Sequence, residues 1–227
     1  MKKQLTYKDV RKEMSIQNIL KKYEEKNIEL KGLLELIEQS GNKRERKFID
    51  FRILSATIKE IQRIIANELN NETLALSTRN IFELNMIYQY TCLNEENLRE
   101  WIGNRANDEI EIIEGMLTLS EKPNSEDEKI AKARIDNIRT TAQNKNYKIS
   151  KQLTTNVLAE KVGLIKEYKG LFKLYSKFIH PTSYIINSNP EAVNSLQYKN
   201  IFLMQFQIYL SDLEARLRVI YTNKHEK

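Results

Sequence analysis

Apolar side chains recur every three or four residues along most of the chain, the spacing that places them on one face of an α-helix. In the first such segment, from about Tyr7 to Gln39, Ile16, Ile19, Leu20 and Tyr23 follow this rule. Further helices are predicted over residues 43–69, 73–93, 95–119, 125–143, 154–162, 164–179 and 190–221. The pattern therefore predicts an all-α fold, a single multi-helix bundle of about seven to eight helices with long first and last helices.

Polar residues and a proline mark several of the predicted helix starts. Asn94 is a good N-cap, and Asn189 followed by Pro190 supplies an N-cap with proline at the first helical position. Ser125 and Glu128 have the spacing of a capping box.

The chain shows no repeat and no marked domain boundary, although the loop at residues 120–124 is the best candidate for one. We predict that residues 1–42 form an N-terminal helix able to serve as an interaction or dimerisation arm. Residues 43–227 then form the helical bundle.

Composition supports this architecture and limits the class of protein. Six glycines and three prolines among 227 residues are too few for collagen-like, low-complexity or short-stranded all-β proteins. The single cysteine, Cys92, excludes an internal disulfide. The charged amino terminus is followed by no apolar run, so we predict no secretion signal and expect a cytoplasmic protein.

Charge is unevenly distributed along the chain. The net charge is +6, yet residues 61–120 carry 4 basic and 10 acidic side chains. Between Lys145 and Pro190 the chain holds eight lysines against Glu160 and Glu167. This basic segment can attract a polyanion or complement the acidic middle of the same chain.

The predicted helix at residues 73–93 carries only two charges, Arg79 and Glu83. These charges and its polar side chains argue against a membrane span, and we expect no membrane association. Because Arg79 and Glu83 are four residues apart, they are neighbours on the helix, and we expect both to be partly buried. One interpretation is a structural ion pair that fixes the packing of the helix. The other is an anion anchor, in which Glu83 orients a guanidinium that binds phosphate or stabilises developing charge.

The predicted helix at residues 164–179 has a core side and an adjoining polar side. The core side carries Leu164, Tyr168, Leu171, Tyr175 and Phe178. The polar side carries Lys169, Lys173, Ser176 and, at its end, His180. Since Pro181 disfavours the α conformation at the preceding residue, we place His180 at the helix terminus, ahead of an irregular segment that extends to residue 188. An imidazole there can stabilise the last carbonyls of the helix or act in acid–base catalysis.

Two stretches of the sequence resemble a known group of proteins. The first is Arg79 with the residues that follow it (RNIFEL), and the second is Tyr175 and Ser176 followed by His180 and its Pro-Thr-Ser sequence. They are similar to uncharacterised bacterial helical proteins distantly related to HEPN domains, over about residues 45–221. The resemblance implies an all-α fold, frequent dimerisation, a place in toxin–antitoxin or antiphage systems, and metal-independent ribonuclease activity. The usual HEPN signature, an arginine and a histidine separated by four to six residues, is absent. No arginine lies between Arg139 and Arg216, and the residues before His180 offer only Lys173 and Lys177 as cations.

For such an activity, His180 would take the 2′-hydroxyl proton, Arg79 would hold the developing charge and Glu83 would orient Arg79. Substrate contacts would come from the remaining candidates, namely Tyr90, Tyr175, Ser176, Lys169, Lys173 and Lys177. Tyr90 or Tyr175 could position phosphate or stack on a base, and the lysines would add salt-sensitive affinity for RNA. We expect no metal and no cofactor, because two histidines and one cysteine cannot form a conventional structural zinc site and no phosphate-binding loop occurs.

A non-catalytic interaction protein is the alternative, with Arg79 and Glu83 as a structural pair. The last predicted helix favours it, because its many apolar residues exceed what one bundle face requires: Ile201, Phe202, Leu203, Met204, Phe206, Ile208, Tyr209 and Leu210. A homodimer or a partner protein, bound through the long first or last helix, would cover the excess.

Overall fold

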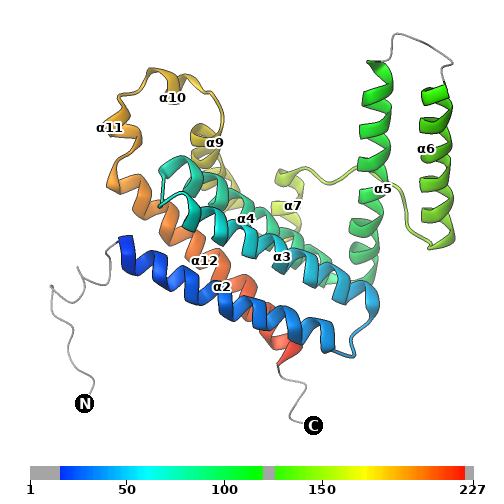
Figure 1. Ribbon diagram of the computed structural model, residues 1–227, viewed down its shortest axis with the longest axis horizontal. Coiled ribbons are helices and arrows are strands. Elements are labelled where there is room, and N and C mark those ends of the chain that lie inside the picture. The colour runs from blue at the N-terminus through cyan, green and yellow to red at the C-terminus, as the bar shows by residue number, and fades with distance from the viewer. Residues whose placement is uncertain (1–15, 120–125, 223–227) are drawn as a thin grey trace. The chain divides into compact units, whose positions relative to one another are not determined.

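The computed structural model describes residues 16–119 and 126–222, and every regular element in them is helical (Figure 1). The predicted all-α class is confirmed. The predicted helix start at Tyr7 and the capping box that begins at Ser125 lie outside the described residues. The chain divides into two compact units, Met1–Tyr88 with Leu164–Lys227, and Gln89–Gly163.

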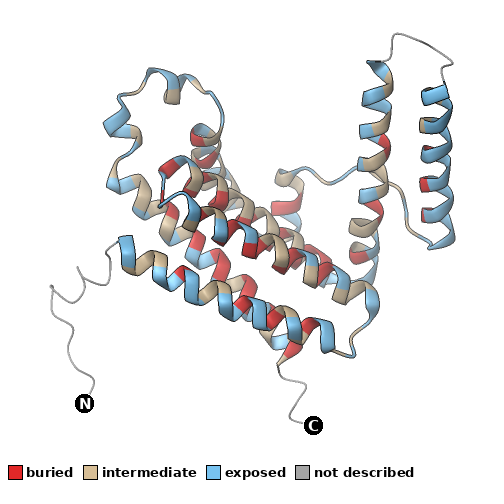
Figure 2. Cartoon of the chain, viewed as in Figure 1, coloured by how far each residue is buried: buried red, intermediate tan, exposed pale blue. Residues whose placement is uncertain are grey.

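The first unit is built around long helices. It contains α2 (Ile16–Gln39), α3 (Arg44–Ala66), most of α4 (Asn71–Leu93), α8 (Ile165–Glu167), the π-helix η1 (Tyr168–Phe172), α9 (Lys173–Ile179), α10 (Ser183–Asn187), α11 (Pro190–Val193) and α12 (Leu196–Tyr221). Its core is continuous along α4 and α12 (Figure 2), where Phe82 packs on Tyr209 with ring centroids 4.8 Å apart. As expected, α4 is buried on most of its faces.

Four charged side chains connect α2 to α12. Lys26 Nζ lies 2.6 Å from Glu29 and 3.0 Å from Glu214, and Arg218 Nη2 lies 2.6 Å from Glu29. Burial alone would lower the pKa of Lys26, but its hydrogen bonds to Glu29 and Glu214 outweigh burial and the pKa is raised. The hydrogen bond from Lys26 holds the pKa of Glu29 below its ordinary value. The face of α2 that carries Leu30 and its neighbours is thus occupied by helices of the same unit.

A buried carboxylate joins α3 to the end of α12. Asp50 is fully buried, pairs with Arg46 one turn earlier, and accepts a hydrogen bond of 2.6 Å from the Tyr221 hydroxyl. The Arg46 guanidinium also lies 5.0 Å from the centre of the Tyr88 ring. A buried charge is tolerated only when it is paired and hydrogen-bonded, and Asp50 meets both conditions.

The second unit contains the last residues of α4, α5 (Glu95–Thr118), α6 (Glu126–Asn144) and α7 (Thr155–Lys161). The antiparallel helices α5 and α6 enclose a small core of Ile110, Ile135 and Ile138 (Figure 1). The predicted N-cap at Asn94 is confirmed, since its side chain accepts a 2.8 Å hydrogen bond from the backbone of Asn97.

Two predicted boundaries were wrong. Residues 180–188 are not wholly irregular, because Thr182 caps the short helix α10. The last helix does not run unbroken from Pro190, since the chain leaves the helical conformation at Ser195 (φ −62°, ψ 146°). The buried Asn71 amide donates to the carbonyls of Val193 and Ser195, at 2.9 and 3.1 Å, and so stabilises this break.

Candidate functional site

Arg79 and Glu83 form the predicted pair on α4. Arg79 Nε lies 3.1 Å from Glu83 Oε1, and the two side chains are 23% and 30% exposed. They are partly buried, as expected, and remain open to solvent. A half-buried pair of this kind holds the guanidinium in place without removing it from the reach of a ligand.

The Arg79 side chain also meets the segment that contains His180. Its Nη1 atom lies 3.3 Å from His180 Nε2, and its guanidinium carbon lies 4.4 Å from the centre of the Phe172 ring. Arg79 and His180 are 101 residues apart in sequence. The fold therefore brings together the two residues for which the sequence suggested catalytic roles.

The contact with Arg79 is compatible with one tautomer of the imidazole. Arginine has only donors, so Nε2 can form a hydrogen bond with Arg79 only as the acceptor, in the tautomer that carries its proton on Nδ1. In that tautomer the Nε2 lone pair is directed at the guanidinium. An exposed imidazole with a lone pair on Nε2 has the form that a general base requires.

The end of α9 fixes the backbone at His180. His180 is extended (φ −116°, ψ 153°), as expected ahead of Pro181. The Thr182 hydroxyl donates to the Lys177 carbonyl at 2.9 Å, and the Thr182 N–H donates to the His180 carbonyl at 2.7 Å. Two hydrogen bonds from one threonine thus hold the turn that carries the imidazole.

The π-helix η1 supplies the aromatic contact to Arg79. Phe172 is its last residue, and the Tyr168 ring packs against the Phe172 ring with centroids 4.8 Å apart. Single π-helical turns are frequent at functional sites. Periodicity alone predicts an ordinary helix here, so Phe172 was not recognised as a site residue.

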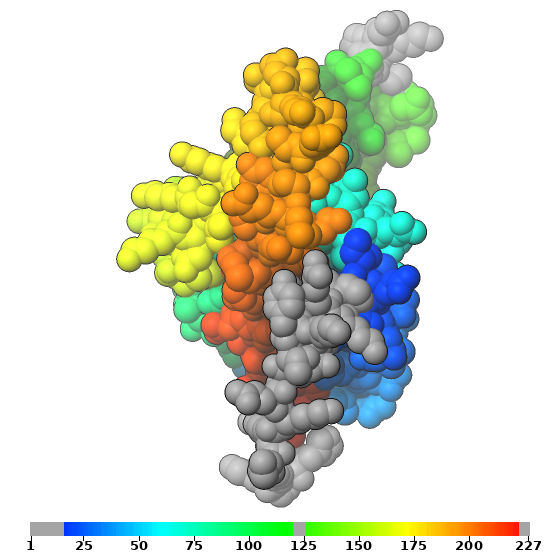
Figure 3. Space-filling model, turned by 90° about the vertical axis from the view of Figure 1, so that its left-hand side faces the viewer, coloured from blue at the N-terminus to red at the C-terminus, as the bar shows by residue number. Residues whose placement is uncertain are grey.

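Lys169, Lys173 and Lys177 are exposed on the same helical run. Figure 3 shows side chains of this yellow segment projecting from the surface. Within the described residues none of the three ammonium groups forms an ion pair. They place three positive charges without an ion-pair partner on the helical run that leads to His180.

Tyr175 and Tyr90 are buried, which corrects their predicted role in substrate contact. Tyr175 is fully buried against Phe202, at a ring distance of 6.0 Å, and burial raises its pKa. Because its ring does not reach solvent, Tyr175 cannot contact a substrate. The Ser176 hydroxyl donates to the Phe172 carbonyl at 3.0 Å, a bond within its own helical run.

Tyr90 belongs to the second unit. It is buried, and its hydroxyl donates to Glu100; burial and this hydrogen bond raise its pKa. The Lys161 ammonium lies 5.8 Å from the centre of the Tyr90 ring. Tyr90 is thus engaged by residues of its own unit.

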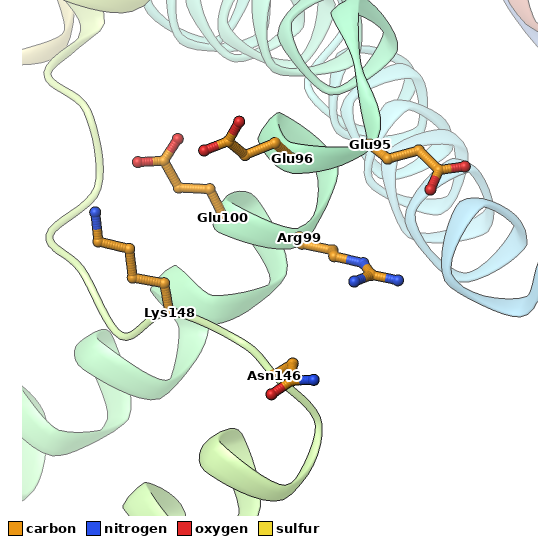
Figure 4. Close-up of a pocket in the computed structure, with 6 residues that line it drawn as sticks. All are labelled: Glu95, Glu96, Arg99, Glu100, Asn146 and Lys148. Atoms are coloured by element: carbon orange, nitrogen blue, oxygen red, sulfur yellow. The ribbon is translucent and has the colours of Figure 1, made fainter.

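The second unit also contains a pocket of about 330 Å³ (Figure 4). It is lined by Glu95, Glu96, Arg99, Glu100, Asn146 and Lys148. Glu96, Glu100 and Lys148 point to one side in Figure 4, whereas Arg99 points to the other. These charges do not converge on one centre.

Two kinds of feature are absent from the described residues. They contain no group of three or more histidine, cysteine, aspartate or glutamate side chains that could hold a metal ion. In the same part of the chain, no helix is long and apolar enough to cross a membrane.

Residues 51–192 match the model of a family of unknown function, DUF5677. The chain belongs to this family. The DUF5677 match covers more than half of the chain and includes Arg79, Glu83, Phe172 and His180. No curated protein and no solved structure matches the chain.

Proposed function

We propose that this protein binds RNA at Arg79 and His180 and cleaves it without a metal ion. The observation that carries the proposal is the 3.3 Å contact between a half-buried guanidinium and an exposed imidazole. The resemblance to HEPN-related proteins, many of them metal-independent ribonucleases, supports the same chemistry and a role in bacterial defence or as a toxin.

In the first step, the scissile phosphate binds the Arg79 guanidinium. Arginine forms charge-assisted, often bidentate hydrogen bonds to phosphate oxygens, which are stronger than a neutral hydrogen bond to imidazole. Phosphate therefore draws the guanidinium away from His180 Nε2 and frees the lone pair of the base. Binding of substrate and exposure of the base are thereby coupled.

In the second step, His180 Nε2 takes the proton of the neighbouring 2′-hydroxyl group. The 2′-oxygen then forms a bond to phosphorus, and the bond from phosphorus to the 5′-oxygen breaks. The 5′-oxygen takes a proton from a water molecule, and the resulting hydroxide takes the proton that His180 received, which restores the base. Arg79 stabilises the charge on the phosphorane, while Glu83 and Phe172 hold its guanidinium in orientation. The products are a 2′,3′-cyclic phosphate and a 5′-hydroxyl.

Single substitutions test the proposal with unstructured RNAs in the presence of EDTA. The wild type should cleave, and His180→Ala or Arg79→Met should each lower the rate by about 100-fold or more. His225→Ala, at the other histidine of the chain, is the matched control and should cleave like the wild type. Equal cleavage by wild type and His180→Ala, or none by either, overturns the proposal.

The non-catalytic alternative keeps one specific observation in its favour. Large apolar side chains of α12 remain exposed, with Met204 at 54%, Ile208 at 51% and Val219 at 63%. We propose as the second candidate that this face of α12 binds a second copy or a partner protein. Light scattering at low and high salt tests self-association, since an apolar interface survives salt. A monomer at both salt concentrations rejects the dimer.

A further inference from the structure

The basic side chains beside the site form a continuous stripe. Lys169, Lys173 and Lys177 follow one another at intervals of four residues, and His180 lies three residues further on. Lys169 lies in η1, and Lys173 and Lys177 lie in α9. The four side chains are all exposed, so a ligand that lies along this face can meet every one of them.

In the described part of the chain, no ion pair neutralises the lysines of this stripe. Elsewhere, exposed lysines do pair: Lys132 lies 2.6 Å from Glu128, and Lys129 lies 3.3 Å from Glu126. Lys169, Lys173 and Lys177 have no such carboxylate. Three like charges on neighbouring turns repel one another, and a bound polyanion relieves this repulsion.

An aromatic pair lies on the same helical run as the lysines. Tyr168 and Phe172 are each partly exposed, with ring centroids 4.8 Å apart. Proteins that bind single-stranded nucleic acids combine a basic track for the backbone with aromatic side chains on which bases stack. A duplex offers no free base faces to such a pair, whereas a single strand does.

We propose that the face of η1 and α9 formed by Lys169, Lys173 and Lys177, with Tyr168 and Phe172 beside it, binds single-stranded RNA and leads it to His180. The inference rests on the proposed function for the identity of the ligand. It adds that the RNA is single-stranded and that it runs along this face of η1 and α9 to His180. The lysines hold successive phosphates, and Tyr168 stacks on a base.

The salt dependence of binding tests this path. The probe is a fluorescent 12-nucleotide RNA with 2′-O-methyl groups, which the intact protein cannot cleave because the nucleophilic hydroxyl is blocked. For a single strand, each lysine that no longer neutralises a phosphate should reduce the slope of log affinity against log salt by about 0.7. Replacing all three stripe lysines with glutamine should therefore make the slope less steep by about 2.

The matched control removes three exposed lysines of α2 and α3, with the same change in net charge. Its substitutions are Lys21→Gln, Lys31→Gln and Lys59→Gln. This variant should keep the wild-type slope. Tyr168→Leu should keep the slope but weaken binding about fivefold or more, because the stacking ring is removed while the charges remain. The corresponding RNA duplex and poly-glutamate, as a model of an acidic protein, should bind at least tenfold more weakly than the single strand.

Each outcome decides the inference. Equal slopes for the two triple variants, or binding of duplex or poly-glutamate as tight as that of the single strand, overturn it. If the wild type cleaves RNA but the stripe variant keeps its slope, the proposed function stands and the path is wrong. If the slope falls as expected while no RNA is cleaved in EDTA, the binding path stands and the catalytic proposal is wrong.

Discussion

Three side chains fix the orientation of the Arg79 guanidinium, although it is only half-buried. Glu83 pairs with its Nε atom, His180 accepts from Nη1, and the guanidinium carbon lies over the Phe172 ring. Each contact uses a different part of the same group. Arginine suits this position better than lysine, because only the planar guanidinium can stack and donate in two directions at once.

At this scale we predict that Phe172→Leu lowers the rate of RNA cleavage about fivefold. The substitution keeps apolar volume but removes the interaction of the ring with Arg79, worth about 1 kcal/mol at a partly exposed site. Single-turnover cleavage rates, with unfolding curves for both proteins, measure the effect. The matched variant Phe48→Leu changes an exposed phenylalanine of α3 and should leave the rate unchanged. An unchanged rate in Phe172→Leu would show that the ring does not hold Arg79 for catalysis.

At the scale of elements, local signals predicted helix ends well wherever a side chain caps its own helix. Asn94 and Asn189 both accept hydrogen bonds from backbone groups within three residues, which the sequence can reveal. The break before α12 depends instead on Asn71, more than 120 residues away. The π-helical turn of η1 shares the apolar periodicity of an ordinary helix. Such features depend on tertiary contacts, so one sequence could not predict them.

A close approach of two backbones gives a prediction for α5. A β-carbon at Gly103 would lie 2.3 Å from the Lys148 carbonyl oxygen, so Gly103→Ala should destabilise the second unit by about 1–3 kcal/mol. Gly115 lies on the same helix with open space around it, so Gly115→Ala should stabilise the helix by up to about 1 kcal/mol. Urea unfolding of both variants measures the difference. Equal free energies of unfolding would show that the segment at Lys148 does not pack on Gly103.

The ionic connection between α2 and α12 gives a pH-dependent prediction. Because the hydrogen bond from Lys26 lowers the pKa of Glu29, the contribution of this carboxylate to stability is complete above the ordinary value of 4.5. The contribution disappears as the pH falls through the lowered pKa of the folded state. Since Glu29 is 48% exposed, Glu29→Gln should cost at most about 1 kcal/mol at pH 7.

Urea unfolding of the wild type and Glu29→Gln at several pH values measures this contribution. The difference between the two proteins should shrink as the pH falls below 4.5. Glu24→Gln, an exposed glutamate of the same helix, serves as the control and should change stability little. A difference that is constant from pH 7 to pH 3 would contradict the role of the Glu29 charge.

At the scale of the whole molecule, the candidate site lies within one compact unit but is built from distant parts of the sequence. Composition and periodicity predicted the all-α class. The two charges of the predicted helix at residues 73–93 suggested Arg79 and Glu83 as candidate site residues, and the position before Pro181 suggested His180. These residues lie close together because α4 packs beside the segment that ends at His180. Hydrophobic periodicity predicts the helices but not which of them pack together. The helical projection placed both Tyr168 and Tyr175 on the core side, but it could not tell that the core encloses Tyr175 and leaves Tyr168 partly exposed.

Cleavage that depends on the 2′-hydroxyl is the most direct test of the central claim. The measurement compares two 12-nucleotide strands of one sequence, one with ribose and one with 2′-deoxyribose, incubated with the wild type in EDTA. The account predicts that only the ribose strand is cut and that its new ends carry 2′,3′-cyclic phosphate. An intact ribose strand, or equal cleavage of both strands, would contradict the assignment of Arg79 and His180 as a ribonuclease site.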